Sequence, residues 1–119
     1  MKILLVDDET KFINMLARRL SLRGLDADVA YSGDQALEKA VRTPYDIAVL
    51  DMKMPGMSGF TLKKKLLDQL PDIKFIFVTG HGTIDQNGIP DQFDDIFLAK
   101  PLNIDTLIET IRKRLNPDL

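Results

Sequence analysis

The 119-residue chain has no cysteine and only one histidine, His81. The absence of cysteine excludes disulfides and thiol catalysis and fits a reducing compartment. A single histidine cannot supply the His and Cys ligands of a zinc site. No apolar run approaches the roughly 18 residues of a membrane span, and the start MKILLVDDE turns acidic too early for a signal peptide. We therefore expect a cytoplasmic protein that makes no contact with a membrane.

An excess of positive charge is also missing. The net charge is −2 and the pI is near 5.3, so no basic field favours direct binding of nucleic acid. The basic runs 63–65 and 112–114 are interpreted as solvated helix faces. With 45% hydrophobic and 29% charged residues, a chain of this length can bury one core. We expect a single domain over residues 1–119.

Short aliphatic runs alternate with longer amphipathic stretches. The runs, several of them apolar on both faces, lie at 2–6, 27–30, 46–50, 74–78 and 95–99. Such runs are typical of parallel strands covered by helices. Apolar residues recur at helical spacing over 10–23, 33–42, 58–70 and 103–115. This alternation predicts an α/β fold with a doubly wound, five-stranded parallel sheet in the flavodoxin-like order 2-1-3-4-5.

Reactive side chains stand just after four of the five predicted strands, where such sheets bind ligands. They are Asp7, Asp8, Glu9, Asp51, Thr79 and Lys100. Each has an ordinary explanation by itself: an acid after a strand can cap a helix or open a turn, and a lysine is usually solvated. Those explanations do not account for all of these residues standing together at one predicted rim.

Clustered carboxylates repel one another unless a cation or protons intervene. Mg²⁺ prefers such hard oxygen ligands, and it usually also contacts water and phosphate oxygens. A lysine beside a magnesium site is typical of phosphoryl chemistry, in which a carboxylate can itself be the nucleophile. The strand-end residues therefore favour Mg²⁺-dependent transfer of a phosphoryl group.

The motifs LLVDDE, DIAVLDMKMPGMSG, VTGHG and FLAKP stand in this order over the whole chain. Together they resemble the receiver domain of response regulators in two-component signalling. The resemblance implies that Asp51 is the phosphoacceptor and that Mg²⁺ or Mn²⁺ is the cofactor. It implies that Asp8 and Asp51 bind the metal directly, Asp7 through water, and Lys53 through its backbone carbonyl. Glu9 is expected to face away from the site.

The remaining matched positions imply further roles. Thr79 matches the hydroxyl that bonds the phosphoryl group, and Lys100 matches the ammonium that pairs with it. The Lys100–Pro101 bond matches the cis peptide of the family, and Phe97 matches the aromatic switch position. The implied partners are a sensor histidine kinase or phosphotransfer protein, which donates the group, and a downstream output domain or protein. The domain would promote its own phosphorylation and dephosphorylation while acting mainly as a switch, and a phosphorylation-dependent homodimer is a further expectation.

Two features depart from the family pattern or vary within it. Between the last two predicted strands, residues 84–94 contain Gly88 and Pro90, which disfavour a helix interior. The resemblance implies that the helix at this place forms the output face together with the fifth strand and the last helix. We expect this helix to be short or irregular. The side chains of Lys53 and His81 are candidates for tuning the lifetime of the phosphoryl group. The alternative for Lys53 is a solvated lysine, and the alternative for His81 is an ordinary loop residue.

Two alternatives remain open at this point. A degenerate receiver would act as a binding module without phosphorylation. A Mg²⁺-dependent phosphatase of the haloacid-dehalogenase type is the other alternative. Its pattern requires two aspartates separated by one residue on the first strand, whereas Asp7 and Asp8 are adjacent.

Overall fold

A computed structural model describes residues 1–80 and 95–116 of the chain. Its five strands are β1 (Ile3–Val6), β2 (Ala27–Ala30), β3 (Ile47–Asp51), β4 (Lys74–Thr79) and β5 (Ile96–Ala99). The helices in the described part are α1 (Thr10–Leu22), α2 (Gly33–Arg42), α3 (Gly59–Gln69) and α4 (Ile104–Leu115). Every one of these elements begins and ends within two residues of its predicted range. The predicted irregular helix at 84–94 lies outside the described residues.

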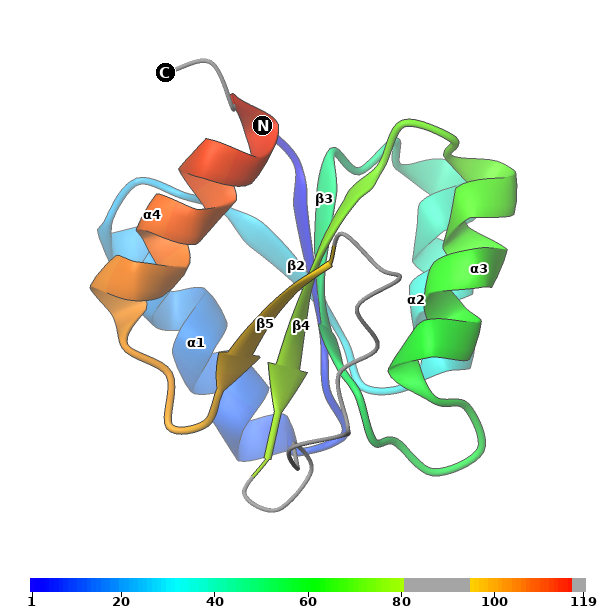
Figure 1. Cartoon of the computed structure of the whole chain (residues 1–119), viewed down its shortest axis with the longest axis horizontal. Coiled ribbons are helices and arrows are strands. Elements are labelled where there is room, and N and C mark those ends of the chain that lie inside the picture. Colours follow the sequence, from blue (N-terminus) through cyan, green and yellow to red (C-terminus); the bar gives the residue numbers. More distant parts are fainter. Residues whose placement is uncertain (81–94, 117–119) are drawn as a thin grey trace.

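All strand pairs are parallel, and the strand order is β2-β1-β3-β4-β5. This confirms the predicted sheet. Figure 1 shows α1 and α4 covering one face and α2 and α3 covering the other. Because successive strand residues point to opposite faces, Leu4 and Val6 belong to the core under α2 and α3, whereas Ile3 and Leu5 belong to the core under α1 and α4. No helix in the described ranges is long and apolar enough to cross a membrane.

Helix boundaries follow from local chemistry. Ser32 and Ser58 cap α2 and α3, each accepting a hydrogen bond from the backbone N–H three residues on. Gly24 has φ +81° after α1, and the N–H of Leu25 bonds the carbonyl of Leu20, as in a Schellman motif. These caps fix where each helix begins or ends relative to the strand ends.

The interpretation of the run 63–65 as a solvated face was wrong for one of its three residues. Lys63 of α3 pairs with Asp95, which directly precedes β5, at 2.7 and 2.9 Å from the two carboxylate oxygens. The Asp95 side chain is only 2% exposed. Lys64 and Lys65 are exposed, as expected. The ion pair ties α3 to the edge strand of the sheet.

We predict that Lys63→Met destabilises the protein by about 3 kcal/mol, because it leaves the buried Asp95 carboxylate without this cation. The matched variant Lys64→Met changes an exposed lysine one position along the same helix. It should change the free energy of unfolding by less than about 0.5 kcal/mol. Urea unfolding of both variants measures the difference, and equal midpoints would contradict the structural role of Lys63.

Candidate phosphoryl-transfer site

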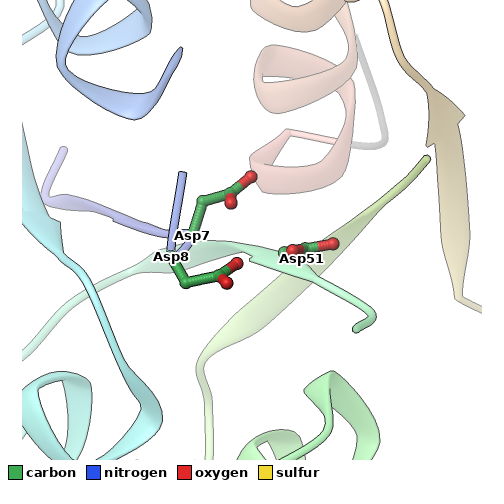
Figure 2. A group of neighbouring side chains, drawn as sticks. All are labelled: Asp7, Asp8 and Asp51. Atoms are coloured by element: carbon green, nitrogen blue, oxygen red, sulfur yellow. The ribbon is translucent and has the colours of Figure 1, made fainter. Parts of the chain in front are cut away.

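Strand register brings the acids together. Val6 of β1 pairs with Leu50 of β3, so the residues that follow, Asp7 and Asp51, emerge side by side. Oxygen atoms of Asp7, Asp8 and Asp51 all lie within 4.8 Å of one another. Figure 2 shows the three side chains at the ends of these two strands, with their carboxylates lying near one another. The predicted carboxylate cluster is therefore present at the predicted edge.

Burial makes this cluster electrostatically strained. Asp7 is 1% exposed and Asp51 is 6% exposed, whereas Asp8 is open to solvent. Burial and the neighbouring charge of Asp7 raise the pKa of Asp51 to about 6, although the ammonium of Lys100 opposes the shift. Burial also raises the pKa of Asp7, against hydrogen bonds from the Glu9 backbone and Lys100. A cation bound between these carboxylates would relieve the strain.

The donor set suits a hard divalent cation. The cluster offers carboxylate oxygens only, two from shielded side chains and one from an exposed side chain that leaves room for water. Mg²⁺ binds through one or two carboxylates while keeping several waters, and Mn²⁺ accepts similar oxygen ligands. The residues present therefore fit the cofactor that the sequence predicts.

Lys100 lies at the end of β5 and closes one side of the cluster. Its Nζ is 2.9 Å from Asp7 Oδ2 and 2.8 Å from Glu9 Oε1, and it lies 4.6 Å from the centre of the Phe12 ring. Burial alone lowers the pKa of Lys100, but the hydrogen bonds to Glu9 and Asp7 outweigh it and the pKa is raised. The peptide bond between Lys100 and Pro101 is cis, as expected from the sequence.

The expectation that Glu9 faces away from the site was wrong. Its carboxylate reaches Lys100, and its backbone N–H donates to Asp7 Oδ1 at 2.9 Å. Glu9 precedes the first turn of α1, and its side chain was expected to extend outward along that turn. The sequence did contain a signal for this contact, because Glu9 is a third acid after the first strand and Lys100 was predicted at the same end of the sheet.

Thr79 ends β4, with its side chain fully buried. Its Oγ1 has no hydrogen-bond partner in the part of the chain that the structure describes. Buried hydroxyls without a partner are uncommon and costly. A hydroxyl in this condition, on the strand next to Asp51, is suited to bond a group added to that carboxylate.

Phe97 of β5 packs into the core under α2 and α3. Its ring stacks on Phe77 at 5.4 Å between centroids and meets Phe60 of α3 edge-on at 6.2 Å. Thr79 pairs in register with Ala99, two residues beyond Phe97. The predicted switch aromatic is thus partly buried on the strand beside Thr79.

Lys53 and His81 were the two candidates for tuning the lifetime of the phosphoryl group. The backbone N–H of Lys53 donates to Asp51 Oδ1 at 3.3 Å, and the Lys53 side chain is exposed. His81 lies outside the described residues.

The loop that follows Asp51 folds back tightly onto its own strand. Gly59, the first residue of α3, donates its N–H to the Met52 carbonyl at 3.0 Å. A Cβ on Gly59 would lie 2.6 Å from the carbonyl oxygen of Asp51, closer than atoms can approach. Only glycine allows this contact, which places α3 against the end of β3 and thereby fixes the backbone of Asp51.

We predict that Gly59→Ala costs about 2 kcal/mol of stability, because the added methyl group must displace the backbone at Asp51. Gly56→Ala is the comparison, since open space surrounds Gly56 and only its φ of +81° disfavours a side chain. Its cost should be about 1 kcal/mol. Thermal or urea unfolding tests the ranking, and a Gly59→Ala variant more stable than Gly56→Ala would contradict it.

Comparison with known proteins identifies the family of this chain. Residues 3–112 match the family described as the response regulator receiver domain. The chain is 32% identical over 116 residues to the transcriptional regulatory protein DltR of Streptococcus agalactiae serotype III (strain NEM316), a match that covers 96% of this chain and 51% of DltR. The chain thus spans about half the length of the first curated relatives it matches.

Solved structures give the same result. The crystal structure of the receiver domain from the hybrid histidine kinase CckA is 31% identical with a TM-score of 0.81, covering 98% of this chain and 100% of that one. A response regulator receiver domain protein from Clostridium thermocellum is 27% identical with a TM-score of 0.85, covering 98% and 94%. This chain belongs to the response-regulator receiver domain family of two-component systems.

Proposed function

We propose that Asp51 accepts a phosphoryl group from a phosphohistidine of a sensor histidine kinase or phosphotransfer protein. The observation that carries the proposal is the shielded Asp51 carboxylate, which shares one strand-end cluster with Asp7 and Asp8. Family membership supports the same role, because receiver domains act with histidine kinases. At pH 7.5 a group with a pKa of about 6 is mainly ionised, so Asp51 is available as a nucleophile.

Mg²⁺ or Mn²⁺ is the cofactor of this proposal. Asp8 and Asp51 would supply direct ligands, Asp7 would act through water, and the backbone carbonyl of Lys53 would complete the protein ligands. When bound, the cation neutralises negative charge on the transferring group and on the carboxylates around it.

The protein's own residues divide the remaining work. An Asp51 oxygen attacks phosphorus, the bond from phosphorus to the imidazole nitrogen breaks, and that nitrogen keeps the electron pair and takes up a proton from solvent. The Lys100 ammonium offsets charge on the phosphoryl oxygens, and the Thr79 hydroxyl donates a hydrogen bond to one of them. Water later attacks the acyl phosphate, which releases inorganic phosphate and restores the carboxylate.

The phosphoryl group adds nearly two negative charges and strong acceptor oxygens beside Thr79. We propose that Thr79 moves toward it and that Phe97 turns further inward in response. The face that includes β5 and α4 would then change shape for a downstream output domain or protein, or for a second copy of the chain. This is a local charge event that biases a two-state element. The proposal includes the cytoplasmic location expected from the sequence. It does not include direct binding to nucleic acid or to a membrane.

A degenerate receiver is the principal competing function. Binding alone would not require the buried Thr79 hydroxyl, which has no hydrogen-bond partner among residues 1–80 and 95–116, or the three clustered acids with Lys100 beside them. The phosphatase alternative is less well supported, because the acids after β1 are adjacent and the third comes from β3.

Incubation with acetyl phosphate and Mg²⁺, followed by intact mass measurement, tests the proposal. We expect a phosphate-sized increment that disappears when EDTA replaces Mg²⁺, because the carboxylate cluster then repels the incoming phosphoryl group. A folded protein that shows no increment with acetyl phosphate or with a purified kinase would favour the binding module.

A further inference from the structure

The ammonium of Lys100 forms its ion pairs with Asp7 and Glu9 rather than with Asp51, the carboxylate it is expected to serve. An ammonium has three N–H donors. Two of them meet Asp7 and Glu9, and the Phe12 ring lies against the same nitrogen. Over residues 1–80 and 95–116 the structure contains no ion pair between Lys100 and Asp51. A group on Asp51 therefore competes with the Asp7 and Glu9 carboxylates for this ammonium.

The position of Glu9 favours its ion pair with Lys100. It occupies the N-cap position of α1, yet its side chain makes no capping hydrogen bond. It extends to Lys100, 91 positions away in sequence. Its backbone N–H binds Asp7, the other partner of Lys100. One residue thus fixes both the acid and the cation in the arrangement seen here.

The two contacts of Lys100 differ in how easily they are given up. The Asp7 side chain is 2% exposed, so removing its cation would leave a buried charge unpaired. The Glu9 side chain is 63% exposed, and water replaces its partner at little cost. The Glu9 contact is therefore the one that a phosphoryl oxygen displaces.

We propose that Glu9 is a positioning residue that holds Lys100 away from Asp51 in the unphosphorylated protein and competes with the phosphoryl group for its ammonium. The proposal rests on the phosphoacceptor function proposed for Asp51. Glu9 then raises the barrier to phosphorylation and favours return to the resting state. Removing its contact frees Lys100 for the phosphoryl group without touching a metal ligand.

Beryllofluoride, which occupies an aspartate as a phosphoryl mimic, tests this by calorimetric titration with Mg²⁺ present. Glu9→Gln should bind it about two- to fivefold more tightly, the range expected for loss of a competing exposed ion pair. Glu9→Asp keeps the charge but is one methylene too short for the 2.8 Å contact. Its affinity should rise as well, which an effect of net charge alone would not produce.

A double-mutant cycle with Lys100→Met completes the test. If Glu9 acts through Lys100, Glu9→Gln changes the affinity for beryllofluoride by less than about 1.5-fold in the Lys100→Met background. An undiminished effect in that background, or a Glu9→Asp protein that matches wild type, overturns the role of Glu9 while leaving the phosphoacceptor intact. No binding of beryllofluoride by the wild-type protein overturns the proposed function itself, and the role of Glu9 with it.

Discussion

The Asp51→Asn variant is expected to take up no phosphate from acetyl phosphate or from a histidine kinase, a loss of at least about 100-fold in rate. The reason is chemical, because an amide oxygen is a far weaker nucleophile than the carboxylate it replaces. Asparagine has nearly the same shape, so the fold and the other site residues remain in place. The initial rate of phosphate incorporation, followed by intact mass, measures the effect.

The control for this variant is an exposed acid away from the site. Asp68→Asn removes a carboxylate from the surface of α3, and it should incorporate phosphate at the wild-type rate. Thr79→Ala is an intermediate case, since it removes only a hydrogen bond to the transferring group. Equal incorporation by Asp51→Asn and wild type would show that the phosphate is attached elsewhere.

The Mg²⁺-free protein is expected to lose stability as the pH rises from about 4 to about 6. The pKa of Asp51 is about 6 in the folded protein and near 3.8 in the unfolded chain. The folded state therefore binds the proton more tightly, and the stability this gives is present below the unfolded pKa and lost as the pH passes through the folded pKa. Raising the pKa of Asp51 from 3.8 to about 6 corresponds to about 3 kcal/mol in the free energy of unfolding. The raised pKa of Asp7 acts in the same direction.

Two changes should reduce this pH dependence. Asp51→Asn has no group to titrate there, so its stability above pH 6 should exceed that of wild type by about 2 kcal/mol in EDTA. Mg²⁺ should also stabilise wild type above pH 6, by about 2.7 kcal/mol at a free concentration 100 times its Kd. Asp8→Asn should abolish most of that gain. Melting curves between pH 4.5 and 7.5 test both, and a wild-type protein indifferent to Mg²⁺ would contradict the metal site.

The sequence predicted the sheet, its strand order and the strand-end acids because each depends on short-range patterns. Runs that are apolar on both faces identify buried parallel strands, and the order of such strands places their carboxyl ends at one edge. The cluster of Asp7, Asp8 and Asp51 follows from that register without any knowledge of side-chain conformation.

The contacts of long, flexible side chains could not be predicted in this way. Glu9 and Lys63 were both interpreted as outward-facing, and both form ion pairs with residues that come next to them only in the folded chain. Their rotamers depend on where β5 begins relative to α3 and where it ends relative to α1, which a pattern of residue types does not specify. The close approach of Gly59 to the Asp51 carbonyl depends on tertiary packing in the same manner.

The most direct test of phosphoryl transfer to Asp51 is the chemical identity of the phosphorylated residue. Borohydride reduces an acyl phosphate on aspartate to homoserine, so reduction after phosphorylation in Mg²⁺, followed by peptide mass spectrometry, locates the group. We predict homoserine at position 51 and at no other aspartate. Homoserine at another aspartate such as Asp7 or Asp8, or a phosphate that resists borohydride, would contradict it.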